Sequence, residues 1–572
     1  MSFKAIFGAF LVLLLLPLVL RLAPIGHGAP RNYVPDTHVV KNALGMAKDK
    51  DLIPPVGKYS SYPYLIPYLL LPIYGGEYAV GRAVGAWHSA DEFKVRALDS
   101  PAIVQIPARV LIALFGALSA LAAFAAARAL GLKSGAWAAA FLVGTSLLHV
   151  QLSTHERPWI PVVFFGLLAV GSAAKHASDG RVFSLLAAAL FAALAFACHQ
   201  SGLIFLGLVG LAWAAAPGTT DGAGWRRRIA RGVIAVAGFA VLALLVGHPY
   251  YLRYGRVPQS DVVGGELASG NFSVGGQAVR LGLSWSSVEH LAVSFFAYDP
   301  VLVVLGVVGL FVWARERRWT MLFVFTLGIG VFFLTNPSDH VRYLLPVGTV
   351  LALFAARTVE LAWTRPATRS IVAVLLAVPL VQAVRFDVVL AREDTRAEAE
   401  RRLAELPQGA RVAIDHYGPA VDLDRSSLER LASLRELRQR EANRLEFLKL
   451  GAYPPERLGL DAVFVEELLG VDPRTGEYGV QPALAARGAT PRELFEALGV
   501  THVLLVDRDG HGSRLDALAA EGREAWQVRP SRSGNAPVEA FLPTEMQFPL
   551  TALWQVDRPG PAMRLIELAS GR

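Results

Sequence analysis

Apolar stretches without a charged residue alternate with short polar turns along the first two thirds of the chain. Lys, Arg, Asp and Glu are absent from 141–151, 161–174 and 233–247. A helix needs about 17–25 consecutive apolar residues to cross a bilayer core, so the alternation predicts a chain that crosses a membrane many times. About eleven membrane helices are predicted, at residues 5–22, 106–127, 135–150, 158–174, 182–198, 201–216, 232–247, 300–314, 319–335, 342–359 and 370–386.

Basic residues fall in every second short loop between these stretches. Loops rich in Lys and Arg stay in the cytoplasm. This pattern therefore predicts that the first outer loop (24–103), the long outer loop (248–300) and the C-terminus lie on the non-cytoplasmic side of the membrane. Within the first outer loop, the amphipathic pieces 36–47 and 73–84 are typical of helices that lie along a membrane surface.

The composition changes sharply after Phe386, where charged residues become frequent. The stretch from Asp394 has the pattern of a helix, a turn with Pro and Gly, and a strand, and the stretch from Pro491 repeats it. The sequence therefore predicts a polytopic α-helical membrane protein of the inner (plasma) membrane. Its membrane domain spans 1–390, and a small C-terminal α/β domain, 391–572, lies outside the cytoplasm.

Charge and cysteine content exclude several classes of function. The formal charge of +8 and the pI near 9.5 are compatible with nucleic-acid binding, but the basic residues lie at segment ends rather than in one patch, which favours membrane orientation. A single cysteine, Cys198, excludes an internal disulfide and a cysteine metal site, and its apolar surroundings predict a buried thiol. No His, Asp and Glu spacing predicts a metal site, so neither a metal nor a cofactor is expected.

Asp36 is the candidate general base. It follows a proline shortly after the first apolar stretch, and a carboxylate at a bilayer boundary can accept a proton from an incoming hydroxyl. The alternative is that Asp36 caps a helix beginning at Thr37, since Pro-Asp-Thr is a good helix start. The two roles are compatible.

Lys58 and Tyr62 begin a Tyr- and Pro-rich stretch that re-enters apolar sequence. A cation flanked by aromatic rings suits a lipid phosphate at the membrane interface. The alternative is an interfacial aromatic belt with one snorkelling lysine.

The remaining candidates also fall on the predicted outer side. Arg342 can clamp a phosphate through its planar fork of donors, or it forms an ion pair with Asp339. The charged triplet at 155–157 is either the lip of a cavity or an exposed turn. Taken together, the predicted substrate-binding residues of these loops are His155, Glu156, Arg157, His248, Tyr250, His340, Arg342 and Tyr343.

Five stretches, taken in order, resemble the GT-C superfamily of polytopic glycosyltransferases, in particular the branch with protein O-mannosyltransferases and the lipid A aminoarabinose transferase. They are YVPDTHVVKNAL (33–44), KYSSYPYLIPYLLLPIY (58–74), RVLIALFGALSALAAFAAARALGL (109–132), LLHVQLSTHERPWIPVVFF (147–165) and HVRYLLPVGTVLAL (340–353). The resemblance covers roughly 1–390. It departs from the family at Thr37, where a Glu is common, and at Glu156, where an Asp is common.

The resemblance implies an inverting transfer of one sugar from a polyprenyl-phosphate donor to an extracytoplasmic glycan, lipid or protein. Asp36 would take the acceptor proton, and Lys58, Arg342 and Arg109 would stabilise the departing phosphate, where negative charge develops. The expected partners are this donor, membrane lipid and the acceptor.

Two alternatives from other classes stay open. A flippase or transporter of lipid-linked sugars would have the same membrane helices without the chemistry, and it would place its binding groups near the bilayer midplane in broken helices. A catalytically inactive relative would act as a binding protein, since the second acid of the family's first loop is missing here.

Overall fold

The computed structural model describes residues 3–33, 37–54, 62–217, 222–255, 272–274, 277–279, 285–312, 316–335, 341–433, 459–465, 469–471, 478–480, 491–507, 515, 522–531 and 548–568. The chain divides into two compact units. The first comprises Met1–Ile25, Asp36–Gly76 and Gln105–Asp387, and the second comprises Gly26–Pro35, Glu77–Val104 and Val388–Arg572. Two pieces of the predicted first outer loop, 26–35 and 77–104, thus cluster with the C-terminal residues, and the predicted boundary at 390 stays a prediction.

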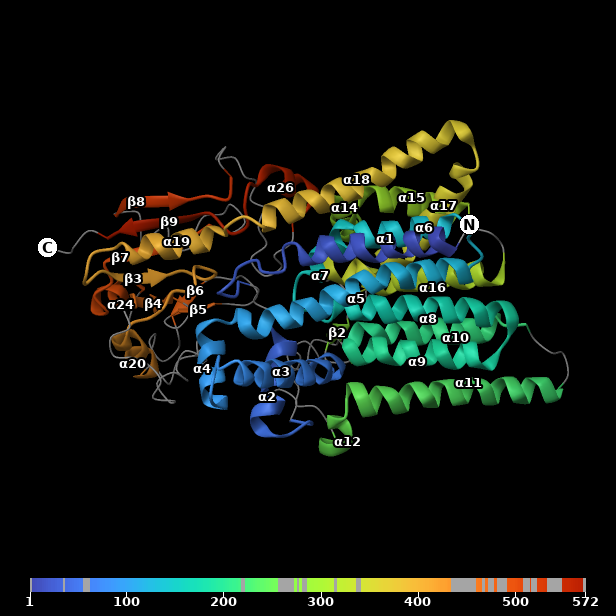
Figure 1. The fold of residues 1–572 in the computed structure, drawn as a ribbon, viewed down its shortest axis with the longest axis horizontal. Coiled ribbons are helices and arrows are strands. Elements are labelled where there is room, and N and C mark those ends of the chain that lie inside the picture. Colours follow the sequence, from blue (N-terminus) through green and yellow to red (C-terminus); the bar gives the residue numbers. More distant parts are fainter. Residues whose placement is uncertain are drawn as a thin grey trace. The chain divides into compact units, whose positions relative to one another are not determined.

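The first unit is built from helices whose positions follow the apolar stretches of the sequence (Figure 1). Helix α8 packs against α9 and α10, α9 also packs against α11, and α17 packs against α15 and α6. The helices and helical turns are α1 (Phe3–Leu22), α2 (His38–Asp49), α3 (Leu65–Ala83), α5 (Ala102–Ala129), α6 (Gly135–Thr145), α7 (Leu147–Ser153), α8 (Trp159–Asp179), α9 (Val182–Cys198), η1 (Gln200–Leu203), α10 (Ile204–Ala215), α11 (Gly222–Leu242), η2 (Ala243–Gly247), α12 (Tyr250–Tyr254), α14 (Trp285–Tyr298), α15 (Pro300–Phe311), α16 (Arg317–Thr335), η3 (Val341–Leu344), α17 (Leu345–Trp363) and α18 (Pro366–Leu390). A short hairpin, β1 (Phe272–Val274) with β2 (Gln277–Val279), also belongs to it.

Five helical segments of the described chain are long and apolar enough to cross a membrane, or six if the bent pair α6–α7 is one span. Shorter apolar helices, including α9, α10 and α15, accompany them. The apolar window of α8 is 72% buried within the chain, whereas that of Gly224–Gly247 is 17% buried, so α8 is central and α11 presents its apolar surface outward. The total of about eleven spans stays a prediction.

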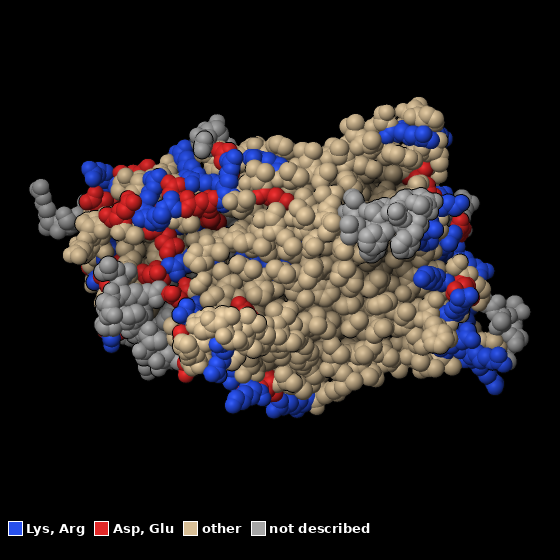
Figure 2. Space-filling view, viewed as in Figure 1, with Lys and Arg blue, Asp and Glu red and all other residues tan. Residues whose placement is uncertain are grey.

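Charge is distributed along the helical unit as the sequence predicts. Figure 2 shows Lys and Arg side chains gathered at the end of the bundle where α11 begins, and a tan flank almost free of charge. Arg226 and Arg227 at that end are exposed, as are Lys133 and Arg365 in loops and Lys175 in the last part of α8. A basic end and an uncharged flank are what a membrane helix bundle requires.

The second unit is organised around a five-stranded sheet of order β4-β3-β7-β9-β8. Strands β3, β4 and β7 are parallel, with Val412 opposite Ala462 and Ala413 opposite Val503, while β9 is antiparallel to β7 and β8. The elements are α4 (Ala90–Asp99), α19 (Thr395–Ala404), β3 (Arg411–Ile414), α20 (Arg425–Ser433), β4 (Asp461–Phe464), β5 (Leu469–Val471), β6 (Tyr478–Val480), α24 (Pro491–Ala497), β7 (His502–Val506), β8 (Arg523–Val528), α26 (Leu550–Gln555) and β9 (Met563–Glu567).

Helices cover both faces of this sheet. Leu403 of α19 and Leu428 of α20 pack with Val412 and Leu504 on one face. Phe495 of α24 packs with alternate strand residues on the other face. Side chains of a strand alternate between faces, so the wholly buried run of β7 reflects a strand covered on both sides. The helix-then-strand pattern predicted from Asp394 and again from Pro491 is confirmed by α19 with β3 and by α24 with β7.

Asp461, at the start of β4, holds two arginines of the second unit. It accepts hydrogen bonds from Arg411 (Nε–Oδ2, 2.8 Å) and Arg430 (Nη2–Oδ1, 2.9 Å). Burial raises the pKa of Asp461, but the hydrogen bonds from Arg411 and Arg430 outweigh it and leave the pKa below its usual value. A carboxyl group whose pKa is lower in the folded than in the unfolded protein stabilises the fold at pH values above its unfolded-state pKa. This stabilisation is lost as the pH falls through the folded-state pKa.

We therefore expect Asp461→Asn to lower the unfolding midpoint at neutral pH, and the difference from the natural protein to shrink as pH falls below about 4. Calorimetry of both proteins in detergent, at neutral pH and at two acidic values, measures this difference directly. A difference that is the same at every pH would show that the carboxylate's charge does not contribute.

Candidate functional site

A broken helix shapes the bundle next to the charged triplet at 155–157, in the predicted outer loop 153–158. Helices α6 and α7 form one apolar run that bends by 53° at Ser146. A break of this kind leaves carbonyls at the end of α6 and amides at the start of α7 without intrahelical partners. In a membrane-spanning chain these groups need partners from the protein itself.

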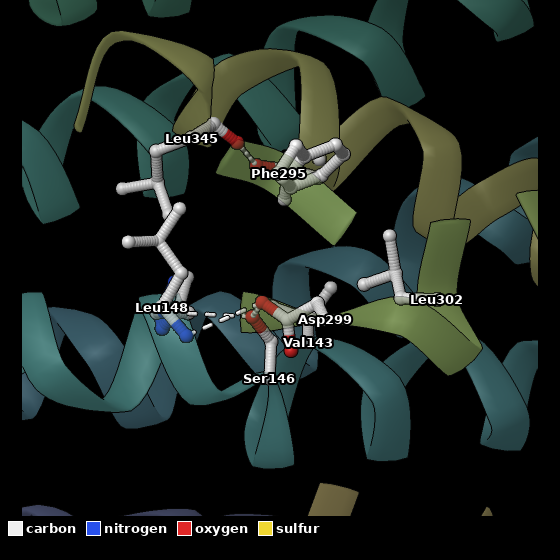
Figure 3. A pocket seen from close by; sticks show the side chains of 10 residues that line it. Val143, Ser146, Leu148, Phe295, Asp299, Leu302 and Leu345 are labelled. Atoms are coloured by element: carbon white, nitrogen blue, oxygen red, sulfur yellow. Dashed lines mark hydrogen bonds between the residues drawn. The ribbon is translucent and has the colours of Figure 1, made fainter. Parts of the chain in front are cut away.

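Asp299, directly before α15, satisfies the amide side of the break. Its Oδ1 accepts from the amide of Leu147 at 2.8 Å, and its Oδ2 accepts from the amide of Leu148 at 3.2 Å and from the hydroxyl of Ser146 at 2.8 Å (Figure 3). A carboxylate at the start of a helix is also favoured by the helix dipole. Asp299 therefore fixes the direction in which α7 leaves the break.

Arg21, at the end of α1, satisfies the carbonyl side. Its Nη1 donates to the carbonyls of Gly144 and Pro17 at 2.9 and 2.7 Å, and its Nη2 lies 2.8 Å from Nδ1 of His149. Its Nε donates to the hydroxyl of Ser153 at 3.1 Å. Because Arg21 is fully buried, we assign it a structural role.

We expect Arg21→Met to lower the free energy of unfolding by about 3 kcal/mol, because two buried carbonyls lose a charged donor. Thermal unfolding in detergent measures the change. Arg253→Gln is the control, since Arg253 pairs with Asp51 while remaining half-exposed, and its midpoint should be unchanged. Equal midpoints for the two variants would contradict the structural role of Arg21.

The same break borders a small cavity (Figure 3). Ser146, His149, Asp299 and Thr349 contribute polar groups to its wall, and Phe295 is among its apolar neighbours. Its volume is about 10 Å³, which is roughly the space that one water molecule requires. The cavity is thus too small for a sugar, and a substrate must bind elsewhere.

The charged triplet before α8 is buried, so its interpretation as an exposed turn is wrong. His155, Glu156 and Arg157 expose at most 1% of their surface. Glu156 Oε2 accepts from Nε of Arg109 at 3.0 Å, and Arg109 Nη1 donates to the carbonyl of Ile25 at 3.2 Å. The ion pair joins α5 to this loop and neutralises both charges inside the protein, where an unpaired charge would be costly.

Aromatic and histidine rings bring five separate parts of the first unit together. The rings of His38 and Tyr62 lie 5.2 Å apart, and the ring of Tyr62 lies 5.2 Å from that of His199. His199 in turn lies 4.0 Å from Trp159, and Trp159 lies 4.8 Å edge-on from Tyr343. We call these five rings and Arg342 the ring cluster.

Arg342 forms the cationic end of the ring cluster. Its guanidinium carbon lies 6.0 Å from the ring centre of Trp159 and 5.6 Å from that of Tyr343. A guanidinium near aromatic faces is held by cation–π attraction, and its planar set of N–H donors matches the geometry of a phosphate. Among the described residues, none accepts a hydrogen bond from the buried indole N–H of Trp159. A buried donor in this state suits a ligand or water.

A second group of tyrosines anchors the start of α3 beside the ring cluster. Tyr64 donates its amide to the carbonyl of Gly247 at 2.9 Å, and its ring contacts that of Tyr250 at 5.5 Å. His248 Nδ1 lies 2.8 Å from the hydroxyl of Tyr250. These contacts fix the chain just after Tyr62 against the end of η2. His248 and Tyr250 thus act on the re-entry segment, and no described contact joins them to Arg342.

Three predicted site residues, Asp36, Lys58 and His340, lie outside the described residues. Helix α2 begins at His38 with Thr37 at its N-cap position, and the Thr37 side chain makes no capping hydrogen bond. Of the predicted residues, Tyr62, Arg342 and Tyr343 meet in the ring cluster, whereas Arg109 and Glu156 pair with each other. The described residues contain no group of three or more His, Cys, Asp or Glu able to hold a metal.

His38, Trp159 and His199 of the ring cluster were not among the predicted site residues. Trp159 begins an apolar helix, and His199 occupies the very short turn between two of them, so both have the pattern of packing residues. A buried indole next to a charged triplet, and a histidine between two membrane helices, are the signals that would have drawn attention to them.

No protein-family model matches the chain, and no curated protein matches it. Among solved structures, it is similar to ArnT from Cupriavidus metallidurans bound to undecaprenyl phosphate, with 16% identity, 72% of this chain and 67% of that chain covered, and a TM-score of 0.43. It is also similar to the apo oligosaccharyltransferase of Archaeoglobus fulgidus (12% identity, 87% and 69% covered, TM-score 0.44). A third is the arabinofuranosyltransferase AftD from Mycobacteria (14% identity, 100% and 40% covered, TM-score 0.43).

These solved structures are GT-C glycosyltransferases, the superfamily that the sequence resembles. At identities of 12–16% this likeness concerns the fold alone. With TM-scores below 0.5, it transfers no residue roles, so the function is argued from the chain's own residues.

Proposed function

We propose that the chain is an integral membrane glycosyltransferase that moves one sugar from a polyprenyl-phosphate donor to an extracytoplasmic acceptor. The observation that supports this most strongly is the ring cluster, in which an arginine and tilted or edge-on rings from five sequence segments meet. Aromatic rings, a cation and an indole N–H from which no described residue accepts suit a sugar phosphate.

The sequence positions of the two remaining candidates fit this cluster. Asp36 precedes His38 by two residues, and Lys58 precedes Tyr62 by four. His38 and Tyr62 are themselves in ring contact. The proposal therefore assigns Asp36 and Lys58 to the site that Arg342 serves, with Asp36 as base and the two cations on the phosphate.

The reaction follows from these roles. The acceptor oxygen forms a bond to the anomeric carbon while Asp36 takes its proton, and the bond from that carbon to the phosphate oxygen breaks with the electron pair leaving on the phosphate. Attack from the face opposite the phosphate inverts the anomeric centre. Lys58 and Arg342 stabilise the charge that develops on the leaving phosphate. Arg109 acts indirectly, by holding the loop of Glu156.

One observation favours the rival reading as a transporter of lipid-linked sugars. The broken helix α6–α7 with Arg21 and Asp299 is a feature that transporters share. However, the cavity at this break has a volume of about 10 Å³, which suits one water rather than a sugar. The break is thus better explained as a rigid support for the loop that begins α8.

Release of free polyprenyl phosphate distinguishes the two functions, because a transporter moves the donor without cleaving it. Purified protein in lipid nanodiscs should release polyprenyl phosphate from a radiolabelled polyprenyl-phosphate sugar when membrane extract supplies acceptor. Movement of intact donor across vesicles without any release would overturn the transferase. The lipid-linked sugar that accumulates in cells lacking the gene identifies which donor to supply.

A further inference from the structure

The segment Gly26–Pro35, which leads directly into Asp36, clusters with the C-terminal residues of the second unit. Arg31 is its main anchor. Arg31 Nη2 lies 2.6 Å from Oε1 of Glu400 in α19 and 2.9 Å from Oδ2 of Asp422 after β3. Arg31 Nε also donates to Glu400 Oε1 at 3.1 Å. One arginine of the segment thus joins two elements of the α/β domain.

Tyr33 provides a second anchor. The guanidinium carbon of Arg396 lies 4.0 Å from the ring centre of Tyr33, and Arg396 Nη1 donates to the Tyr33 carbonyl at 3.4 Å. Asp394 fixes this guanidinium from below, accepting from its Nε at 2.8 Å and its Nη2 at 2.7 Å. Arg396 is 2% exposed and Tyr33 is 7% exposed, so the stack is buried and little screened by water.

A third contact holds the start of the segment. The amide of Ala102 donates to the carbonyl of Pro30 at 3.3 Å, and Arg31 Nη1 donates to the carbonyl of Asp99 at the end of α4. Helix α4 is itself fixed, because Val95 and Leu98 pack against the core of the sheet. The segment is therefore bound by α19, by Asp422 and by the end of α4.

We propose that the C-terminal domain acts as a positioning element for the reaction, because it anchors the segment that leads directly into Asp36. This inference depends on the proposed function and gives the domain a role in it. Arg31 and Arg396 are then positioning residues that act through the backbone of residues 31–35. A displacement of a catalytic group by about 1 Å can cost about a hundredfold in rate, so loss of one anchor should show in turnover.

The test compares Arg31→Gln with a matched control. Arg31 has a side-chain exposure of 16%, and Arg430, which pairs with Asp461 elsewhere in the same unit, has 18%. Arg430→Gln therefore removes an ion pair of similar burial without touching the segment. Arg31→Lys keeps the positive charge and serves as the conservative rescue.

Hydrogen exchange of peptides covering 30–45 and the kinetics of donor cleavage are measured on the full-length variants. We expect Arg31→Gln to raise exchange in these peptides and to lower kcat about tenfold or more with the donor KM little changed. Arg430→Gln should do neither, and Arg31→Lys should restore most of kcat. Unchanged exchange, or raised exchange with unchanged kcat, would overturn the proposal.

This experiment also separates failure of the inference from failure of the proposed function. If the natural protein cleaves no polyprenyl-phosphate donor, the transferase is overturned, and so is the positioning role that depends on it. Hydrogen exchange of the peptides covering 30–45 then still shows whether Arg31 holds the segment Gly26–Pro35 in place. If the natural protein cleaves the donor and Arg31→Gln cleaves it equally well, only the positioning role is overturned.

Discussion

Replacing Asp36 with Asn is expected to lower sugar transfer by about two to four orders of magnitude, the usual contribution of a positioned base. Asn has nearly the same shape as Asp but its amide cannot act as a base, and the N-cap of α2 is Thr37, so the substitution removes only the proton acceptor. Turnover of a radiolabelled polyprenyl-phosphate sugar by purified protein measures the effect.

Asp51→Asn is the matched control for this substitution. Asp51 lies near the other end of α2, where it pairs with Arg253, and its loss should leave turnover unchanged. Unchanged turnover in Asp36→Asn would remove Asp36 from the role of base. A large loss in both variants would point to a general effect of charge in this segment.

Replacing Arg342 with Ala is expected to lower kcat/KM for the donor by about two to three orders of magnitude, as for loss of a group that stabilises developing negative charge. Arg342→Lys should recover part of the activity, because it keeps the charge but loses the planar fork that lies beside Trp159 and Tyr343.

Arg357, on α17 and likewise partly buried beside Glu360, gives the control. Arg357→Ala should keep donor cleavage while its unfolding midpoint is compared with that of Arg342→Ala. A thermal shift in Arg342→Ala large enough to account for the lost activity would mark Arg342 as a structural residue instead.

The sequence predicted the helices well because their pattern is local. The stretch 182–198 forms a helix with these same limits, since Arg181 and His199 bound a continuous apolar run. The break at Ser146 was not predicted. Its partners Asp299 and Arg21 lie more than a hundred residues away, and no local pattern reveals that a distant carboxylate satisfies the amides of α7.

The candidate site likewise combines residues that local patterns reveal with residues that only long-range contacts reveal. Arg342, Tyr62 and Tyr343 were found because charge and aromatic residues at the ends of apolar runs are visible in the sequence. Trp159 and His199 were missed, because a tryptophan beside a charged triplet and a histidine in a short turn are weak signals, and the ring contacts that join five segments appear only in the folded chain. Burial of Glu156 with Arg109 is also a long-range outcome, which a short charged turn does not indicate.

The C-terminal domain illustrates a third limit of local patterns. Its strands at 411–414 and 502–506 follow from alternating helix and strand signals. The association of 26–35 with it depends on single ion pairs and a cation–π contact, such as Arg31 with Glu400, and 77–104 packs on it through Val95 and Leu98. Such contacts join residues more than three hundred positions apart, so they emerge only in the folded chain.

The central claim is that the polyprenyl-phosphate donor binds at the ring cluster. Photo-crosslinking with a polyprenyl phosphate that carries a benzophenone next to its phosphate tests it most directly. The account predicts labelled peptides that contain Tyr62, Trp159 or Arg342, with labelling abolished by excess unlabelled polyprenyl phosphate. Competable labelling confined to the opposite, basic end of the bundle around Arg226–Arg228 would contradict it.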